Sequence, residues 1–270
     1  MRTPDVTCVV PARLGSTRFP RKLLQALLGK PVVVHAMERA LEADCFADVV
    51  CFTDSVEIGE AVAEYGFRFV LTGEAANGTE RIGRNLDAIE TELVVNLQGD
   101  EPAFPTQGLK DLCRALQQNP EWVHTLVHEL GPSTDSTGSP QAPLRNQELE
   151  NPNRVKAMLD ADGFVLDFVR GPGVPNEKGG LPSAPTDTTI RAHRLHLGAY
   201  AYSKNFLRRY ATAPVSKREI EMSHELLRDL NLAPIRAHAS SPGSPVDVPA
   251  DLVFALERLE ILCAPQGVLS

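Results

Sequence analysis

The sequence lacks any long apolar run. No stretch of about 18 consecutive apolar residues occurs among its 270 residues, and the chain does not begin with the apolar core of a signal peptide. We therefore expect a protein without a membrane span that stays in the cytoplasm. With 43% hydrophobic and 23% charged residues, the composition is that of a globular protein, large enough for one substantial core with a second lobe.

Paired cysteines and a net positive charge are missing as well. The five cysteines are scattered, and no two of them form a C-x-x-C pair, so a disulfide framework is not expected. The formal net charge is -8, which argues against nucleic acid and anionic membrane as partners. Any strongly basic segment is therefore a local feature that needs its own explanation.

Positive charge gathers near the start of the chain, in the stretch VVPARLGSTRFPRKLL. An apolar run ends at Pro11, and a basic loop follows with four cations: Arg13, Arg18, Arg21 and Lys22. Arginine, lysine and backbone N–H groups are common ligands of a triphosphate, and Gly15 and Ser16 let the backbone approach phosphate closely. The loop lacks the G-x-x-x-x-G-K-[ST] pattern of a P-loop. It is either a phosphate site or a solvated charged loop.

Strand and helix signals alternate over the first hundred residues, which predicts βαβ units and a parallel sheet covered on both faces. The expected strands are 7–10, 49–53, 67–71 and 92–97, and the expected helices are 32–43, 55–66 and 79–90. In the first of these helices, one face is expected to carry Val33, Met37, Ala40 and Leu41.

The remainder of the chain departs from this alternation. Its expected elements are a helix 107–118, a strand 122–127, a hairpin 154–170 turning at Asp162 and Gly163, a strand 195–202, a helix 218–230, a strand 235–239 and a final helix 249–262. Two long polar loops, 131–143 and 171–188, interrupt them, and we expect the second to act as a lid. The final helix would begin at Pro249 and bury Leu252, Leu256 and Leu259.

Three polar features lie at the expected carboxyl ends of strands, where ligands of a parallel sheet bind. They are the basic loop, the pair Thr53-Asp54 and the stretch QGDEP at 98–102. Asp100 suits a magnesium site shared with substrate phosphates, although a turn would also explain it. Asp247 precedes the final helix, where a carboxylate either caps the helix or reaches a metal.

Eight segments together match one family in the same order along the chain. They are PARLGSTRFPRKLL, GKPVVVHAMERALEA, NGTERIGRN, VVNLQGDEP, NPNRVKAMLDADG, HLGAYAYSKNFLRRY, IEM and VDVPADLVFALERL. Through them the chain resembles the CMP-KDO synthetases (3-deoxy-manno-octulosonate cytidylyltransferases). The resemblance implies an α/β fold, a Rossmann-like nucleotidyltransferase with a mixed, mainly parallel sheet and a smaller β-rich lobe. It implies one domain over 1–270, with a nucleotide-binding core (1–130), an acceptor and dimerisation lobe (150–215) and a return to the core (216–270).

The implied reaction joins CTP to a small anionic acceptor and releases pyrophosphate, with Mg²⁺ as cofactor and a homodimer as the assembly. The family pattern puts the triphosphate on Arg13, Ser16, Arg18 and Lys22, and Mg²⁺ on Asp100 and Asp247. It puts Arg81 and Gln98 near the nucleotide, and on the acceptor side Lys156, Arg170, His196, Tyr200 and Tyr202. Catalysis would rest on Lys22, Arg18, Arg13 and Asp100, which neutralise and position charge without a covalent nucleophile.

The departures from the family pattern cluster on the acceptor side. Leu195 replaces an arginine, and His224 and Glu225 replace a Glu-Gln pair. Further differences are Ala75, Ala76, Asn77, Val169 and Val248, a longer region 131–148 and a glycine- and proline-rich 171–188. Either the acceptor is still KDO, or the pocket takes another sugar acid or a small acid such as a phosphonate, with His224 and Glu225 as acceptor contacts.

Two other classes of function fit parts of the sequence. A nucleotide-binding paralogue without activity is one, but Lys22, Asp100 and Asp247 are all present and argue for catalysis. The other is a relative that uses a sugar phosphate, or a glycosyltransferase. A glycosyltransferase would be expected to show an Asp-x-Asp motif after the strand, and QGDEP does not.

Overall fold

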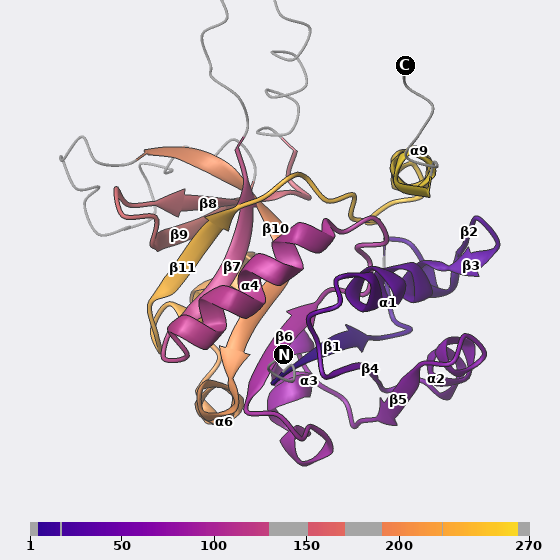
Figure 1. Ribbon diagram of the computed structural model, residues 1–270. Helices are drawn as coiled ribbons and strands as arrows, with labels where there is room; N and C mark the ends of the chain where they lie inside the picture. Colours follow the sequence, from indigo (N-terminus) through magenta and orange to yellow (C-terminus); the bar gives the residue numbers. More distant parts are fainter. Residues whose placement is uncertain (1–4, 17, 130–150, 171–190, 223, 264–270) are drawn as a thin grey trace, which may run out of the picture.

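A nine-stranded sheet forms the centre of the molecule (Figure 1). The computed structural model describes residues 5–16, 18–129, 151–170, 191–222 and 224–263. The strand order is β11-β7-β10-β6-β1-β4-β5, and β8 and β9 extend the sheet beside β10. The strands are β1 (Val6–Ala12), β4 (Asp48–Thr53), β5 (Arg68–Leu71), β6 (Leu93–Leu97), β7 (Val123–His128), β8 (Val155–Leu159), β9 (Val165–Arg170), β10 (Arg191–Ser203) and β11 (Ile235–Ala239).

The sheet is mixed and mainly parallel, as the sequence predicts. Strand β1 runs parallel to β4 and β6, β4 is parallel to β5, and β11 is parallel to β7. Strand β10 is antiparallel to its neighbours β6, β7 and β8. It therefore lies within the main sheet and also pairs with the β8–β9 hairpin, so the hairpin is continuous with the main sheet.

Helices cover both faces of the sheet (Figure 1). They are α1 (Val32–Glu42), α2 (Val56–Ala63), α3 (Gly78–Gly83), α4 (Thr106–Gln118), α6 (Lys204–Thr212), α7 (Lys217–Met222), α8 (Leu226–Asp229) and α9 (Asp251–Cys263). Two 3₁₀ turns, Lys22–Leu24 and Leu86–Ala88, and a short pair, β2 (Ala26–Leu27) and β3 (Lys30–Pro31), complete the described elements.

Strand β1 is buried along its whole length because apolar clusters form on both of its faces. Cys8 and Val10 pack into a cluster with Met37 of α1, whereas Val9 points to the opposite cluster, which contains Ile82 of α3 and Leu207 of α6. Alternate residues of a strand face opposite sides, so an unbroken apolar run is what a doubly covered strand requires.

Two expected helices are broken. The helix 79–90 ends at Gly83 and is followed by the 3₁₀ turn, because the Asn85 side chain donates to the backbone carbonyl of Arg81 at 2.8 Å and competes with helical bonding. The helix 218–230 is divided into α7 and α8. In α1 the expected buried face included Leu41, but Leu41 is exposed, and only Val33, Met37 and Ala40 of that set are buried.

The hairpin is confirmed: β8 and β9 are antiparallel, and Gly163 has a φ of +82°, which favours glycine at the turn. The final helix begins at Asp251 rather than Pro249 and buries Leu259, with Leu252 and Leu256 partly buried against the core. The loops at 131–148 and 171–188 lie outside the described residues. The division into 1–130, 150–215 and 216–270 stays a prediction.

Candidate active site

A cleft of about 1240 Å³ opens at the carboxyl ends of β1 and β6 and runs along β10 toward the hairpin. It brings together most of the residues that the sequence predicts for a site. Those lining it are Arg13, Arg18, Arg81, Gln98, Asp100, Arg170, His196, Tyr200, His224, Glu225 and Asp247. Segments far apart in the chain thus meet in one place, as strand-end sites of α/β sheets require.

Cations of the basic loop contact two carboxylates that come from other segments, those of Asp100 and Asp247. Lys22 Nζ contacts the carboxylate of Asp100, lies 3.4 Å from Oδ1 of Asp247, and donates to the carbonyl of Val246 at 3.0 Å. Arg18 Nη2 donates to the same Asp247 oxygen at 3.0 Å. Burial lowers the pKa of the Lys22 ammonium, but the charges and hydrogen bonds of Asp100 and Asp247 outweigh burial and raise that pKa. The Lys22 ammonium group therefore stays protonated at neutral pH.

Other cations of the loop have different positions. Arg13 is exposed at the rim of the cleft, and Arg18 also binds the side chain of Asn153, a residue that sequence analysis did not single out. Arg21 pairs with Glu57 and does not line the cleft. Ser16 is half-buried in the loop but likewise does not line the cleft.

The Asp247 carboxylate does not cap the final helix. That role belongs to Asp251, whose Oδ2 accepts the backbone N–H groups of Asp247 at 2.7 Å and Val248 at 2.9 Å. This is the acidic half of a capping box, so the box survives in part although Val248 has no hydroxyl. Of the two roles open to Asp247, capping is excluded, and its side chain faces Lys22 and Arg18 instead.

Asp100 and Asp247 are suitable ligands for a hard divalent cation. Both converge on one ammonium group, and their side chains remain 23% and 19% exposed. Among the described residues no group of three or more His, Cys, Asp or Glu side chains is arranged to hold a metal. Two carboxylates fit Mg²⁺, which commonly takes one or two protein oxygens and completes its shell with water and substrate phosphates.

Glu101 is a buried acid that sequence analysis missed. One of its oxygens accepts the backbone N–H of Gly198 at 3.1 Å, and the other has no partner among the described residues. Burial, and then the charge of Asp100, raises the pKa of Glu101 to about 8. The sequence signal that could have identified Glu101 is its position beside Asp100, shortly after a buried strand. Glu101 ties that strand end to β10.

The nucleotide-side residues Arg81 and Gln98 already have protein partners. Arg81 is buried and pairs with Asp54 at 2.5 Å, and it also donates to Thr72 and to the carbonyl of Gly73. It thereby fastens the ends of β4 and β5 beside the cleft. Gln98 Nε2 donates to Glu225 Oε1 at 3.2 Å, which connects the end of β6 to the acceptor side.

Neutral aromatic groups form much of the wall that the resemblance assigns to the acceptor. The His196 and Tyr200 rings stack at 5.4 Å with an angle of 6°. The Thr125 hydroxyl donates its one hydrogen to the carbonyl of Ala199. In the 2.9 Å bond between Thr125 Oγ1 and His196 Nε2, the donor is therefore the Nε2–H group of His196. Burial, and then the charge of Arg170, lowers the pKa of His196 to about 3. The ring is therefore uncharged.

Arg170 brings a guanidinium group to the same part of the cleft. Its Nε donates to the carbonyl of Met222 at 2.9 Å and its Nη1 to that of Asn153 at 3.0 Å. Two predicted acceptor residues do not line the cleft. Lys156 is buried and donates to the carbonyls of Asn151 and Arg154, while the buried Tyr202 hydroxyl bonds Thr79 Oγ1 at 2.8 Å. In this structure both support the wall from behind.

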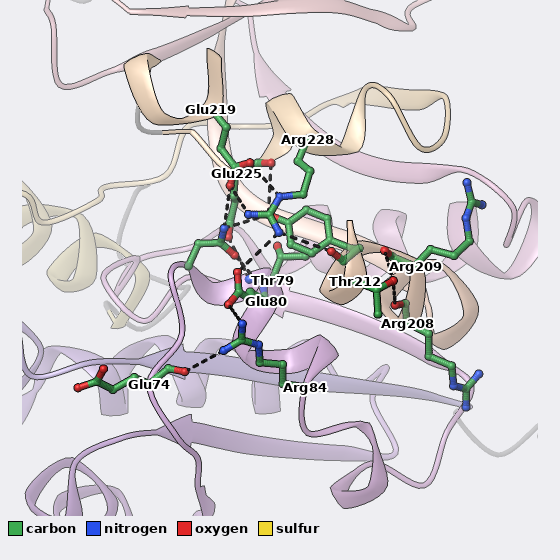
Figure 2. A network of polar contacts seen from close by, with 12 residues as sticks. Glu74, Thr79, Glu80, Arg84, Arg208, Arg209, Thr212, Glu219, Glu225 and Arg228 are labelled. Carbon is green, nitrogen blue, oxygen red and sulfur yellow. Dashed lines mark hydrogen bonds and ion pairs between the residues drawn. The ribbon is translucent and has the colours of Figure 1, made fainter. Parts of the chain in front are cut away.

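A charged network lies behind the same wall (Figure 2). Arg228 makes two bonds to Glu219, at 2.7 and 2.8 Å, and lies 3.6 Å from Glu80, which also pairs with Arg84 at 2.6 Å. The network joins α3 to α7 and α8. Asn77 caps α3 and donates to Glu219 at 3.1 Å, so this departure from the family pattern is part of the wall.

The chain matches the family model described as Cytidylyltransferase over residues 7–236. It is 36% identical over 270 residues to a 3-deoxy-manno-octulosonate cytidylyltransferase of Polynucleobacter necessarius, covering 97% of each chain. It is 37% identical over 231 residues to the enzyme of the same name from Idiomarina loihiensis, covering 83% of this chain and 85% of that one.

Solved structures give the same picture. The structure of CMP:2-keto-3-deoxy-manno-octonic acid synthetase complexed with CTP superposes with a TM-score of 0.76 at 29% identity, covering 95% of this chain and 98% of that chain. HddC from Yersinia pseudotuberculosis, at 13% identity and a TM-score of 0.62, covers 94% of this chain and 98% of its own, and shares the fold.

Within the described residues, no helix is both long and apolar enough to cross a membrane.

Proposed function

Because the chain belongs to the cytidylyltransferase family, we propose that it transfers CMP from CTP to a sugar acid such as KDO and releases pyrophosphate. The observation that carries the proposal is the contact of Lys22, which does not itself line the cleft, with Asp100 and Asp247, which line it together with Arg18. A firm cation and two carboxylates at one point are what triphosphate and a divalent cation need together.

In the proposed reaction, a hydroxyl oxygen of the acceptor bonds to the α-phosphorus of CTP. The bond from that phosphorus to the bridging oxygen breaks, pyrophosphate leaves with the electron pair, and the hydroxyl proton passes to solvent. Lys22, Arg18 and Arg13 stabilise the charge that builds on the leaving pyrophosphate. Asp100 and Asp247 would hold Mg²⁺, which polarises the α-phosphate when bound.

The remaining residues would position the two substrates. Arg170, which lines the cleft with the stacked His196 and Tyr200, would contact the acid group of the acceptor. Gln98 would mark the boundary between nucleotide and acceptor. From the family resemblance, we further propose a homodimer with the β8–β9 hairpin in the acceptor and dimerisation lobe. From the composition of the sequence, we propose that the protein acts in the cytoplasm.

A second candidate keeps the chemistry and changes the acceptor to another small acid, such as a phosphonate. Leu195, which replaces a family arginine, lines the cleft together with His224. Without that cation, an acidic group of the substrate would be buried without a partner, which would weaken its binding by about 1–3 kcal/mol. The loss therefore changes which acids bind well. A nucleotide-binding paralogue without activity is less well supported, since Lys22, Asp100 and Asp247 are all present and contact one another.

The test is pyrophosphate release with CTP, Mg²⁺ and a panel of acceptors: KDO, other sugar acids and small phosphonates. Asp100→Ala serves as the control and should abolish the signal. Release with KDO supports the first candidate, and release only with another acid supports the second. Silence across the whole panel, with CTP still bound, would overturn both and favour the inactive paralogue.

A further inference from the structure

Two free thiols from distant parts of the chain lie in contact on the face of the sheet that α1 and α4 cover (Figure 1). Cys45 follows α1 in the connection to β4, and Cys113 belongs to α4. Their Sγ atoms are 3.4 Å apart, and the Cys113 thiol donates to the Cys45 sulfur. The sulfurs of a disulfide are about 2.05 Å apart, so only a small movement of two side chains separates this contact from a bond.

The two other described thiols are less suited to reaction with solutes. Cys8 on β1 and Cys51 on β4 are fully buried in the apolar core. Burial raises the pKa of the Cys8 thiol, and it raises that of Cys51 to about 12. Cys45 is only half-buried, so a small molecule in solution can reach it.

The charges around the pair make its two thiols unequal. The hydrogen bond from Cys113 lowers the pKa of Cys45 most, and burial opposes that effect. The charges of Lys110 and Arg114 on α4 lower this pKa further, and Asp44 opposes them. The same hydrogen bond, together with burial, raises the pKa of Cys113. The more accessible thiol is therefore also the one that ionises more readily, as an attacking cysteine beside a resolving cysteine must.

We propose that Cys45 and Cys113 form a reversible redox site, in which Cys45 attacks a small disulfide such as glutathione disulfide and Cys113 resolves the product. The Cys45 sulfur bonds to one sulfur of the small disulfide, whose S–S bond breaks, and a first thiol leaves with the electron pair. The Cys113 sulfur then bonds to Cys45 and displaces the second thiol. The two cysteine protons end on the two released thiols, so the cysteines are oxidised while the small disulfide is reduced.

The new bond would join two helical segments beside the cleft without entering it, since neither cysteine lines the cleft. Arg39 of α1 already donates to the carbonyl of Phe104, just ahead of α4, at 3.1 Å. The cysteines are 68 positions apart, so their bond would close a long loop and restrict the unfolded chain. Oxidation should therefore raise the melting temperature by about 5–10 °C. This inference does not depend on the proposed cytidylyl transfer.

The test uses the wild-type protein in mixtures of reduced and oxidised glutathione, followed by alkylation and digestion without reduction. We expect mass spectrometry to show a peptide that links Cys45 to Cys113, and dithiothreitol should remove it. The ratio of linked to free pairs should fall with the square of the reduced glutathione concentration, because each bond releases two thiols. Absence of the peptide in excess glutathione disulfide, or a link from Cys45 to Cys8, would overturn the inference.

Two variants assign the roles of the thiols. Cys113→Ala has no resolving thiol, so glutathione should stay bonded to Cys45 as a mixed disulfide. In Cys45→Ala the attacking thiol is gone, and Cys113 should take up glutathione about tenfold more slowly than Cys45 does in Cys113→Ala. Equal rates would overturn this assignment.

A matched control is Cys51→Ala, which removes a buried thiol outside the pair and should form the linked peptide as the wild type does. Loss of the linked peptide in this variant would contradict a site made of Cys45 and Cys113 alone. A lower melting temperature of the oxidised wild type would show that the bond forms only by distorting the fold, and would overturn a site built into it.

Discussion

Lys22 and Asp247 stand 225 positions apart in the chain, yet the ammonium nitrogen of one lies 3.4 Å from a carboxylate oxygen of the other. Asp100 contacts the same ammonium from the end of β6. The backbone of Val246 donates to the carbonyl of Asp100 at 2.8 Å, which fixes the two acidic segments side by side. One cation therefore organises three distant segments at the point where the reaction is proposed to occur.

Replacing Lys22 should remove the centre of this arrangement. In Lys22→Met we expect kcat/KM for CTP to fall by about 10²–10³-fold, because charge on the leaving pyrophosphate loses its nearest stabilising group. Pyrophosphate release under single-turnover conditions measures the effect. Arg21→Gln, in the same loop but paired with Glu57 outside the cleft, is the matched control and should behave as wild type. Equal losses in both variants would contradict a specific role for Lys22.

Asp247 and Asp251 should separate metal binding from helix capping. Asp247→Asn is expected to raise the Mg²⁺ concentration for half-maximal activity at least tenfold, while changing the free energy of unfolding by less than about 1 kcal/mol, because its ion pairs are partly exposed. Asp251→Ala is expected to lose about 1 kcal/mol of stability through the lost cap. Mg²⁺ titrations and urea unfolding measure the two quantities. An unchanged Mg²⁺ requirement in Asp247→Asn would remove it from the metal site.

Breaking the Arg228 network should lower the free energy of unfolding. Arg228→Met leaves Glu219 and Glu80 buried without their shared cation, and breaking such a buried pair typically costs about 3–5 kcal/mol. Urea unfolding followed by circular dichroism measures the loss, and the exposed Arg208→Met is the control. Adding Glu219→Gln to Arg228→Met should recover part of the loss. A loss below about 1 kcal/mol would show that the network is not a structural element.

Buried neutral histidine should make the protein sensitive to acid. His196 has a pKa of about 3 in the folded chain, against an ordinary 6.5. Between these values the unfolded chain binds a proton that the folded chain does not, so this residue lowers stability as the pH falls below about 6.5. The slope approaches about 1.4 kcal/mol per pH unit.

His196→Gln retains a donor for Thr125 and removes the titration. The difference in unfolding free energy between wild type and this variant should therefore change steadily between pH 6.5 and 4 and stay constant above pH 7.5. Urea unfolding at each pH supplies the difference. A difference that is flat throughout would place the imidazole in a solvated, ordinary environment.

The strands and the gathering of the basic loop with Asp100 could be foreseen, because the apolar runs that mark the strands are local and strand ends of a parallel sheet meet at one edge. The place of β10 between β6 and β7 was not predicted, since it depends on contacts between distant segments. Asp247 was open between two roles. Only the hydrogen bonds of Asp251 decided it, since either carboxylate could cap the helix.

Features that depend on non-local contacts were missed. Glu101 reads as part of a turn, yet it is buried against β10, which lies about a hundred residues later in the chain. The helix expected at 79–90 differs for a local reason instead, because the Asn85 side chain bonds the backbone carbonyl of Arg81 and ends the helix early. Lys156 and Tyr202 follow the family pattern and still lie behind the cleft wall, because neighbouring residues of β8 and β10 occupy its surface.

The division of labour between chain segments has an evolutionary consequence. The basic loop and Asp100 come from the first hundred residues, whereas Arg170 on β9, and His224 and Glu225 just before α8, come from segments that follow later in the chain. A substitution in these later segments can therefore alter one wall of the cleft without touching the basic loop or Asp100. Evolution could then change what one wall contacts while the opposite wall keeps its residues.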